Sequence, residues 1–318
     1  MFCSTVIPTI GRLSLSRAVQ SVLEQEFTAA DFEVIVVNDS GQPLAAASWQ
    51  HSERVRVIHT NRRDRSVARN TGAAIARGEF LHFLDDDDWL LPGALQSFLR
   101  LARTSEALLL YGNALLVDRN GNPLVQLVYD LAGNCFIQMI AGEFFFLGSF
   151  VVDAKTFFAV GGFNPLMPAS EELDLCRRIA LHGPFAGTSA VVVCVGVGQK
   201  DSATDYSGLA AYSRWAREAI LNEPGAFARM RDSAHNSYWR GRIVRAYVTS
   251  VVWNLQHKRL FTAASRAIFS LSSLALAGRH LFSADFWRAV AKPHQSFAFS
   301  RGVWKTNPPE QLVAKHKL

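Results

Sequence analysis

Four consecutive carboxylates, Asp85 to Asp88, directly follow the apolar run at residues 80–84. Solvated acidic runs belong to disordered tails rather than to the end of a segment with the pattern of a buried strand. In an extended backbone alternate residues share a face, so Asp85 and Asp87 would point one way, and Asp86 and Asp88 the other. Oxygen ligands at this spacing suit Mg²⁺ or Mn²⁺, so the run predicts a divalent-metal site. The alternative is that it caps a helix beginning near Pro92.

The elements that would position these carboxylates alternate between strand and helix. Strand patterns occur at residues 3–7, 33–37, 55–58 and 80–84, and helix patterns at 14–25, 66–76 and 92–102. This rhythm is typical of an α/β fold with a mostly parallel, twisted, Rossmann-like sheet flanked by helices. Ligands of such sheets bind beyond the carboxyl ends of the strands. Polar groups follow three of these strands, namely Thr9 with Arg12, Asn38 with Asp39, and the acidic run.

Further elements are predicted after residue 110. A hairpin joins residues 114–118 and 123–128 through the turn Asn120-Gly121. Buried strands are expected at 144–152 and 190–197, a loop at 161–164, and a helix at 171–182 with Gly183 as its C-terminal stop. From about residue 206 the pattern is helical. We therefore divide the chain into a domain at 1–205 and a smaller α-helical region at 206–318.

Composition bounds the class of protein. The chain has 318 residues, enough for about two domains, and 19% charged with 49% hydrophobic residues indicates a folded protein. A strand pattern begins almost at Met1, leaving no secretory signal, and no run is long enough to span a membrane. A cytoplasmic protein is therefore expected. The four cysteines show no disulfide or zinc spacing and should be free buried thiols.

Charge is unevenly distributed along the chain. Residues 1–199 carry 15 Lys and Arg against 20 Asp and Glu, whereas residues 200–318 carry 18 against 7. Aromatic residues are interspersed with the basic ones at 233–318, which would suit a peripheral contact with the inner, anionic face of a membrane. An ordinary helical subdomain with solvated basic residues is slightly favoured over this contact. A nucleic-acid partner is disfavoured because no recognition motif accompanies the charge.

Six segments between residues 6 and 183 resemble, in order and spacing, the family-2 glycosyltransferases with the GT-A fold. They are VIPTIGR (6–12), EVIVVNDSG (33–41), Arg69-Asn70-Thr71-Gly72, FLDDDDWLLPGAL (83–95), VGGF (160–163) and EELDLCRRIALHG (171–183). The resemblance implies transfer of a sugar from a nucleoside-diphosphate sugar, with UDP as the favoured nucleotide, to an acceptor hydroxyl with inversion at the anomeric carbon. The acceptor would be a cell-surface glycan, a glycolipid or a similar lipid-linked molecule.

The resemblance also implies how the donor would be bound. Thr9 and Arg12 would contact the nucleotide, and Asp39 would accept a hydrogen bond from the base. Arg69 and Asn70 would hold the nucleotide or diphosphate near a helix start. The nearby Arg62, Arg63 and Arg65 are expected to form a solvated basic face instead.

Within the acidic run, the family pattern Asp-x-Asp-Asp aligns with Asp85, Asp87 and Asp88. Asp85 would face the ribose and the metal, Asp87 would bind the metal, and Asp88 would orient the loop or support the metal. Asp86, in the variable place beside the donor, is expected to tolerate solvent. The Mg²⁺ or Mn²⁺ ion would offset charge on the departing diphosphate.

The catalytic base of the family lies in an acidic segment that opens a helix. Glu172 stands where the family has an Asp, so one extra methylene displaces the carboxylate. Glu171 and Asp174 are the other candidates, and Asp174 lies four residues before Arg178, the spacing of a plain ion pair. Many relatives carry a His after the last strand, which this chain lacks. Lys200 could contact the diphosphate there, or be an exposed loop lysine.

Two other classes of function are weighed against this interpretation. A catalytically silent member of the fold would bind nucleotide sugar or partners without turnover. A nucleotidyltransferase would need a glycine-rich basic loop after the first strand, whereas VIPTIGR contains one Gly. The interpretation as a dehydrogenase has still less support, because no G-x-G-x-x-G follows a strand. His82, inside an apolar strand, is expected to be a satisfied core histidine.

Overall fold

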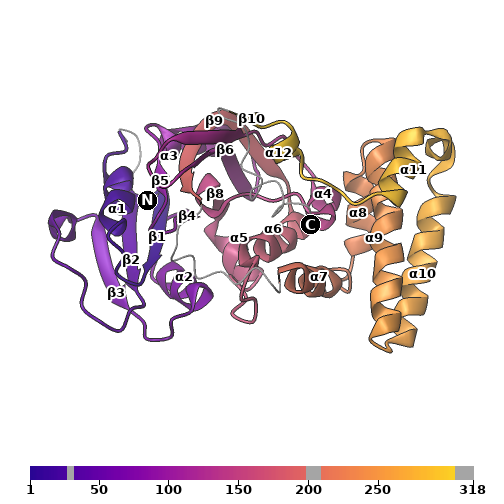
Figure 1. Cartoon of the computed structure of the whole chain (residues 1–318), viewed down its shortest axis with the longest axis horizontal. Coiled ribbons are helices and arrows are strands. Elements are labelled where there is room, and N and C mark those ends of the chain that lie inside the picture. Colours follow the sequence, from indigo (N-terminus) through magenta and orange to yellow (C-terminus); the bar gives the residue numbers. More distant parts are fainter. Residues whose placement is uncertain (27–31, 198–208, 305–318) are drawn as a thin grey trace.

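A computed structural model describes residues 1–26, 32–197 and 209–304 of the chain (Figure 1). One mixed sheet runs through the molecule in the order β10-β7-β6-β8-β4-β1-β2-β3, with β9 beside β6 and β5 beside β9. Its strands are β1 (Cys3–Thr9), β2 (Phe32–Asn38), β3 (Val55–His59), β4 (Phe80–Phe83), β5 (Trp89–Leu90), β6 (Leu109–Val117), β7 (Pro123–Leu127), β8 (Phe150–Asp153), β9 (Phe185–Gly196) and β10 (Val303–Trp304).

Helices flank the sheet and then continue as a helical C-terminal region. The first group is α1 (Leu15–Leu23), α2 (Arg65–Ala74), α3 (Ala94–Thr104), α4 (Phe136–Ala141), α5 (Ala154–Ala159) and α6 (Glu171–His182), with the 3₁₀ turns η1 (Ser48–His51) and η2 (Leu147–Ser149). The second is α7 (Leu209–Ile220), α8 (Ala226–Ser233), α9 (Ser237–Gln256), α10 (Leu260–Ala275), η4 (Gly278–Phe282), α11 (Ala284–Ala291) and α12 (Phe297–Ser300).

The predicted parallel sheet is present over β3, β2, β1 and β4. Strands β1 and β2 are buried along their whole length, as expected when helices cover both faces. Gly72 allows α2 to pack directly on β1, because a Cβ atom there would lie 2.4 Å from Val6 Cγ1. Thr9 pairs with Asn38 at the end of the two strands, so their carboxyl ends meet at one edge.

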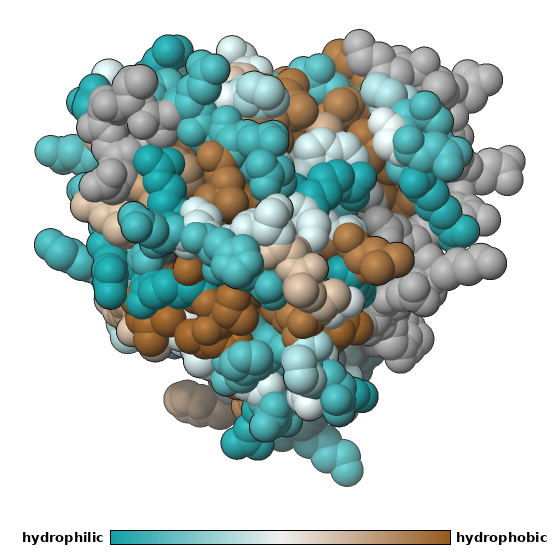
Figure 2. Space-filling view, turned by 90° about the vertical axis from the view of Figure 1, so that its left-hand side faces the viewer, coloured by the Kyte–Doolittle hydropathy of each residue, from teal (hydrophilic) through white to brown (hydrophobic). Residues whose placement is uncertain are grey.

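Beyond β4 the sheet becomes mixed. Strand β8 pairs antiparallel with both β4 and β6, while β6 and β9 are parallel. The predicted hairpin is present, with β6 and β7 joined by a turn in which Gly121 has φ 83°. The half-buried edge strand β3 ends the sheet on the other side, where the surface mixes hydrophilic and hydrophobic residues (Figure 2).

The structure corrects two predictions about local elements. The strand expected at residues 144–152 begins only at Phe150, because Phe145 packs from a loop against Tyr111 and Tyr129, and a 3₁₀ turn follows. A Cβ on Gly148 in that turn would lie 2.8 Å from Val193 Cγ2. The acidic run does not cap the next helix either, because β5 intervenes and Gly93 is the N-cap of α3.

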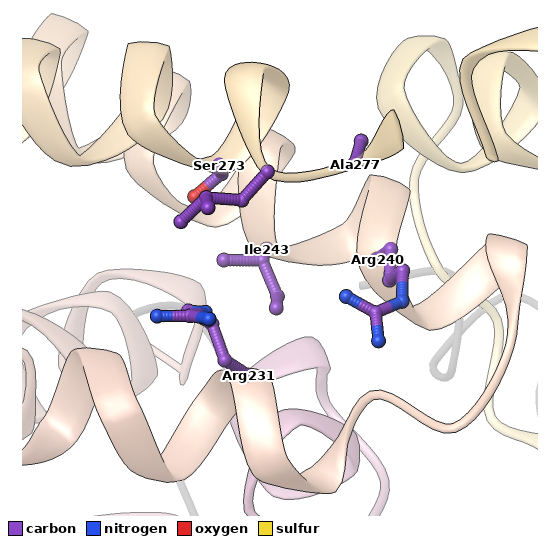
Figure 3. Close-up of a pocket in the computed structure, with 6 residues that line it drawn as sticks. Arg231, Arg240, Ile243, Ser273 and Ala277 are labelled. Carbon is purple, nitrogen blue, oxygen red and sulfur yellow. The ribbon is translucent and has the colours of Figure 1, made fainter. Parts of the chain in front are cut away.

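The C-terminal helices pack around α9, which contacts α4, α8, α10 and α11. A small hollow lies where α8, α9 and α10 meet, lined by Arg231, Arg240, Ile243, Ser273, Leu276 and Ala277 (Figure 3). No helix in the described ranges combines the length and apolar character needed to cross a bilayer. All four cysteines are buried free thiols, as predicted.

A buried polar cluster returns the end of the described chain to the sheet domain. The Glu143 carboxylate, 2% exposed, accepts hydrogen bonds from His294 Nε2 (2.9 Å), Ser296 Oγ (2.8 Å) and the Phe297 backbone N–H (2.8 Å). Tyr238 Oη lies 2.8 Å from the other ring nitrogen of His294. Strand β10 then pairs antiparallel with β7. The helical region is thus joined to the sheet at both of its ends.

We expect Glu143→Gln to destabilise the protein by about 3 kcal/mol, because an amide leaves buried donors without an acceptor. Denaturant unfolding measures the loss, and trypsin cleavage after Arg301 should become faster. Glu106→Gln, which changes an exposed carboxylate, serves as the matched control and should stay within about 0.5 kcal/mol of wild type. Equal stability of the two variants would contradict the anchoring role.

Candidate functional site

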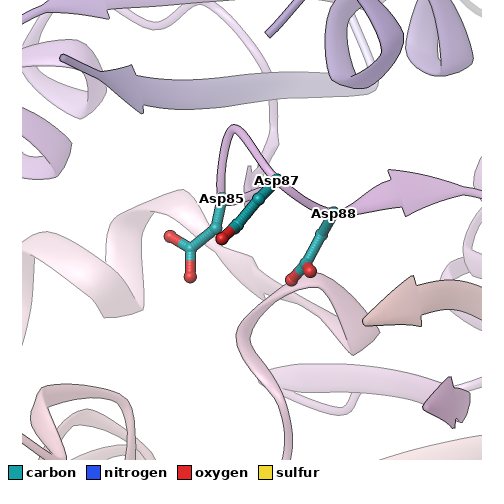
Figure 4. Close-up of side chains that lie close together, drawn as sticks. All are labelled: Asp85, Asp87 and Asp88. Carbon is teal, nitrogen blue, oxygen red and sulfur yellow. The ribbon is translucent and has the colours of Figure 1, made fainter. Parts of the chain in front are cut away.

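The acidic run folds as a turn rather than as an extended strand. The Asp88 backbone N–H donates to the Asp85 carbonyl at 3.1 Å, so the strict alternation expected of an extended chain is wrong here. The turn instead gathers Asp85, Asp87 and Asp88, whose carboxylate oxygens lie within 4.8 Å of one another (Figure 4). Asp88 also accepts a hydrogen bond from the Gly196 backbone N–H at 2.9 Å, which ties the turn to the end of β9.

Asp86 differs from the prediction that it tolerates solvent. It is 4% exposed and accepts hydrogen bonds from Thr9 Oγ1 at 2.6 Å and from Arg12 Nη1 at 2.8 Å. The turn directs its side chain toward the end of β1, where Arg12 Nη1 also lies 3.3 Å from Asp87. Because β1 and β4 are adjacent parallel strands, Thr9 lies close to the residue that follows β4. Asp86 therefore fixes the turn to the neighbouring strand.

Arg69 joins the two acidic groups of the sequence. It is 1% exposed and lies in α2, with Nη2 2.6 Å from Asp85 and Nη1 2.8 Å from Glu171. Its guanidinium lies 5.2 Å from the centre of the Phe163 ring. Burial opposes the charge, but the two carboxylates outweigh it and raise the pKa of Arg69. Arg69 thus stays charged and holds α6 against the acidic turn.

The carboxylates of the turn differ in how well their charge is balanced. Burial would raise the pKa of Asp85, but the adjacent Arg69 outweighs burial and holds it below its usual range. Burial and then repulsion from Asp85 raise the pKa of Asp87 to about 6, and the same two causes raise that of Asp88 well above its usual range. The turn therefore concentrates more negative charge than its arginine neighbours neutralise.

Helix α6 begins at the predicted residue and in an unusual backbone conformation. Ser170, just before it, has φ 61° and ψ 27°, the left-handed region that non-glycine residues rarely adopt. Of the three acidic residues in the first turn, Glu171 pairs with Arg69, and Asp174 accepts two hydrogen bonds from Arg178 at 2.7 and 3.0 Å. The predicted alternative role of Asp174 as an ion-pair partner is therefore present.

Glu172 is the remaining carboxylate of that turn. No other described residue donates a hydrogen bond to its side chain, which is half-buried. Burial and then repulsion from Glu171 raise the pKa of Glu172 to about 7. Such a carboxylate exchanges its proton near neutral pH, which suits a general base or acid.

Three other predicted residues lie at the expected edge, but their side chains are engaged within the protein. Thr9 Oγ1 donates to Asp86 and accepts from the Gly11 N–H. Asp39 accepts hydrogen bonds from Thr60 Oγ1 and the backbone N–H groups of residues 62 and 64, at 2.7 to 3.0 Å. Asn70 pairs through both ends of its amide with the backbone of Phe163, at 2.8 and 2.9 Å. These residues shape the loops around the edge.

Two arginines contact the acidic segments in a way that the sequence did not predict. Arg65, expected on a solvated face, lies 3.6 Å from Glu171 and donates to the Pro168 carbonyl at 3.1 Å. Arg17 donates to the Asp87 carbonyl at 3.0 Å and stacks 3.7 Å from the centre of the Trp89 ring. The helical repeat of α1 contained no signal for this contact, since it depends on where β5 packs. Lys200 lies outside the described residues.

His82 is confirmed as a core residue. Its ring lies 3.2 Å from Thr5 Oγ1 and 3.0 Å from the Gly148 carbonyl, and burial lowers its pKa to about 4. It is therefore neutral at physiological pH. Each of its ring nitrogens has a partner within the core.

The donor set of the turn fits a hard divalent cation. Asp85, Asp87 and Asp88 offer oxygen atoms alone, grouped closely enough to share one ion, and the charges of Asp87 and Asp88 are not fully balanced by neighbouring groups. Mg²⁺ and Mn²⁺ prefer such ligands, whereas softer ions favour nitrogen or sulfur. Among the described residues, these three carboxylates form the group of at least three potential ligands that lie close enough together to hold a metal.

Comparisons with known proteins agree with this arrangement. The family model described as glycosyl transferase family 2 matches residues 4–167, more than half of the chain. Poly(ribitol-phosphate) beta-N-acetylglucosaminyltransferase TarP of Staphylococcus aureus is 26% identical over 149 residues, 45% of each chain. A GalNAc(5)-diNAcBac-PP-undecaprenol beta-1,3-glucosyltransferase of Campylobacter jejuni is 32% identical over 126 residues, 37% of this chain and 40% of that relative. The chain thus matches less than half the length of these relatives.

A solved structure extends the likeness to the whole fold. The crystal structure of S. aureus TarS 1-349 in complex with UDP-GlcNAc superimposes with a TM-score of 0.58 over 86% of this chain and 91% of that one, at 13% identity. The likeness covers the sheet domain and the predicted C-terminal helical region. The chain therefore belongs to glycosyl transferase family 2 and has the GT-A fold.

Proposed function

We propose that this protein transfers a sugar from a UDP-linked donor to a hydroxyl of a cell-surface glycan, glycolipid or other lipid-linked acceptor, with inversion at the anomeric carbon. The observation that carries the proposal is the placement of two acidic groups, 85–88 and 171–174, on either side of the buried Arg69. The names of the TarP and Campylobacter jejuni relatives, and the UDP-GlcNAc of the TarS structure, support this donor and acceptor class.

Asp85, Asp87 and Asp88 would hold Mg²⁺ or Mn²⁺. When bound, the ion supplies positive charge that stabilises the diphosphate leaving group. Three contacts hold the acidic turn in position for the ion. Arg69 holds Asp85, the end of β9 holds Asp88, and Arg12 lies 3.3 Å from Asp87.

The donor would lie along the carboxyl edge formed by β1, β2 and β4. The side chains of Arg12 and Arg65, which are 24% and 38% exposed, would contact the phosphate oxygens. Arg69, by contrast, is buried between two carboxylates, so it would position Asp85 rather than contact the diphosphate. Thr9, Asp39 and Asn70 would shape the nucleotide pocket through the loops that they hold, and Lys200 would reach the diphosphate.

Glu172 would act as the general base. An inverting displacement removes the acceptor proton on the side opposite the leaving group, so the base must be separate from the carboxylates that face the diphosphate. Glu171 and Asp174 are already paired with Arg69 and Arg178. The acceptor oxygen would form the new bond to the anomeric carbon as its proton passes to Glu172 and the diphosphate departs.

Asp87→Asn should abolish ion-dependent binding of the donor. In wild type, UDP-N-acetylglucosamine with Mn²⁺ should stabilise the protein by about 2.7 kcal/mol at a hundredfold excess over Kd. Thermal unfolding with Mn²⁺ or with a chelator measures this. Asp285→Asn changes an exposed carboxylate in the same way and should retain the full effect. If the donor stabilises wild type equally with and without Mn²⁺, and stabilises Asp87→Asn to the same extent, the metal assignment is refuted.

Glu172→Gln should lower kcat by about 10² to 10⁴, because the acceptor proton loses its recipient. In wild type, kcat should fall as the pH decreases through about 7, where Glu172 becomes protonated, and this limb should vanish in the variant. The raised pKa also means that the charged Glu172 destabilises the fold as the pH rises. Glu172→Gln should therefore be more stable than wild type at pH 8, by up to about 3 kcal/mol, but not at pH 4.

Asp174→Asn is the matched control for this substitution. It removes a paired carboxylate from the same helical turn, so it should lower stability while retaining the pH dependence of kcat. Glu172→Asp, which restores the family's residue, should retain measurable transfer. If Asp174→Asn abolishes turnover and Glu172→Gln does not, Asp174 is the base.

A further inference from the structure

Helix α10 has its apolar and polar faces partly reversed, since polar residues as well as Phe269 and Leu274 pack inward while other large apolar residues face outward. The face packed against the rest of the protein contains Ala263, Arg266, Ser270 and Ser273, each at most 8% exposed. The opposite face, which we call the α10 outer face, consists of Phe261, Ala264, Ile268, Leu271 and Ala275, all exposed. A helix on the surface of a water-soluble protein normally buries its apolar stripe and exposes its polar one. The reversal indicates that something apolar covers the outer face.

Large hydrophobic side chains continue this surface beyond the helix. Phe261 is 90% exposed and Phe282, in η4, is 93% exposed. Leu260, Leu276 and Trp287 are each at least half exposed. Helix α10 lies at the end of the molecule farthest from β3 (Figure 1), so the acidic turn and α6 do not share this surface. Exposed hydrophobic side chains of this size, gathered at one end of a molecule, mark an interaction site.

Basic residues surround the α10 outer face. Lys258 and Arg259 precede the helix and Arg279 follows it, and all three are exposed. Asp285 is the acidic residue in the described segment 234–304, where it pairs with Arg288. An isologous contact with a second copy would bring these like charges together, which is unfavourable, whereas an anionic surface would attract them.

The hollow beside α10 adds two guanidinium groups to this charge. Arg231 and Arg240 lie on either side of Ile243 (Figure 3), and no carboxylate of a described residue pairs with either one. Leu276, which is 51% exposed, lines the same hollow.

We infer that the α10 outer face, with Phe282, docks on an anionic phospholipid bilayer and inserts its apolar side chains at the interface. Helix α10 has 16 residues, about 24 Å at 1.5 Å per residue, and would lie in the membrane plane with its buried face against α9. Lys258, Arg259 and Arg279 would contact the lipid phosphates. The docking does not depend on the proposed chemistry of the acidic turn.

Sedimentation of the full chain with lipid vesicles tests this inference. Wild type should bind vesicles of phosphatidylcholine mixed with phosphatidylglycerol, and bind pure phosphatidylcholine at least about tenfold more weakly. The double variant Phe261→Ser, Phe282→Ser should reduce partitioning about 100-fold, because two exposed aromatic side chains lose their insertion. The double variant Lys258→Glu, Arg259→Glu should reduce it at least about tenfold. In wild type, Trp287 fluorescence should shift to the blue on binding.

Leu13→Ser, which removes a fully exposed hydrophobic side chain from the opposite domain, is the matched control and should bind as wild type does. Unchanged thermal unfolding of the variants would show that their fold is intact. The inference fails if wild type does not bind anionic vesicles, or if the two Phe substitutions leave binding unchanged. It also fails if they convert an oligomer to a monomer without affecting vesicle binding, since the face would then be a contact between copies.

Discussion

The buried Arg69 is the interaction on which the candidate site depends. A guanidinium that is almost fully excluded from water must be matched by negative charge, and Asp85 and Glu171 provide it. The ion pairs join segments that are 16 and 102 residues away in sequence. The next residue, Asn70, holds the backbone of Phe163, and Gly162 with φ 66° lets that loop approach, since a Cβ there would lie 2.7 Å from Asn70 Oδ1.

The carboxylates around Arg69 fall into two groups. Asp85, Glu171 and Asp174 are paired with arginines, and Asp86 with Arg12 and Thr9, so they hold elements in place, although burial still raises the pKa of Asp86. Asp87, Asp88 and Glu172 carry raised pKa values because burial and neighbouring carboxylates outweigh the nearby positive charge. Perturbed groups of this kind concentrate where a protein binds ions or moves protons. The paired carboxylates hold the elements that position Asp87, Asp88 and Glu172. Crowding these carboxylates together lowers the stability of the fold.

The C-terminal helices follow the same principle of buried polar anchors. Arg177 in α6 donates to the carbonyls of Met139 and Ser213, at 3.1 and 2.9 Å, and so links the sheet domain to α7. Glu143 holds the returning segment before α12. Tyr238 of α9 contacts His294 of the same cluster, which holds α9 on the side of the sheet. The opposite side of α9 faces α10, where small and polar residues pack inward beside Phe269 and Leu274 while Phe261, Ile268 and Leu271 remain exposed.

The sequence alone determined the alternating strands and helices, the start of α6 at Glu171, the hairpin at Asn120-Gly121 and the concentration of polar residues at one edge of the sheet. These features follow from local periodicity and turn chemistry, which are encoded within a few residues. Tertiary packing makes the acidic run a turn, directs Asp86 to Thr9, places Arg69 between two acidic groups and leaves residues 144–149 without a strand. Each of these features depends on a partner that is distant in sequence. The role of a side chain is set by the charge or backbone group that folding places beside it.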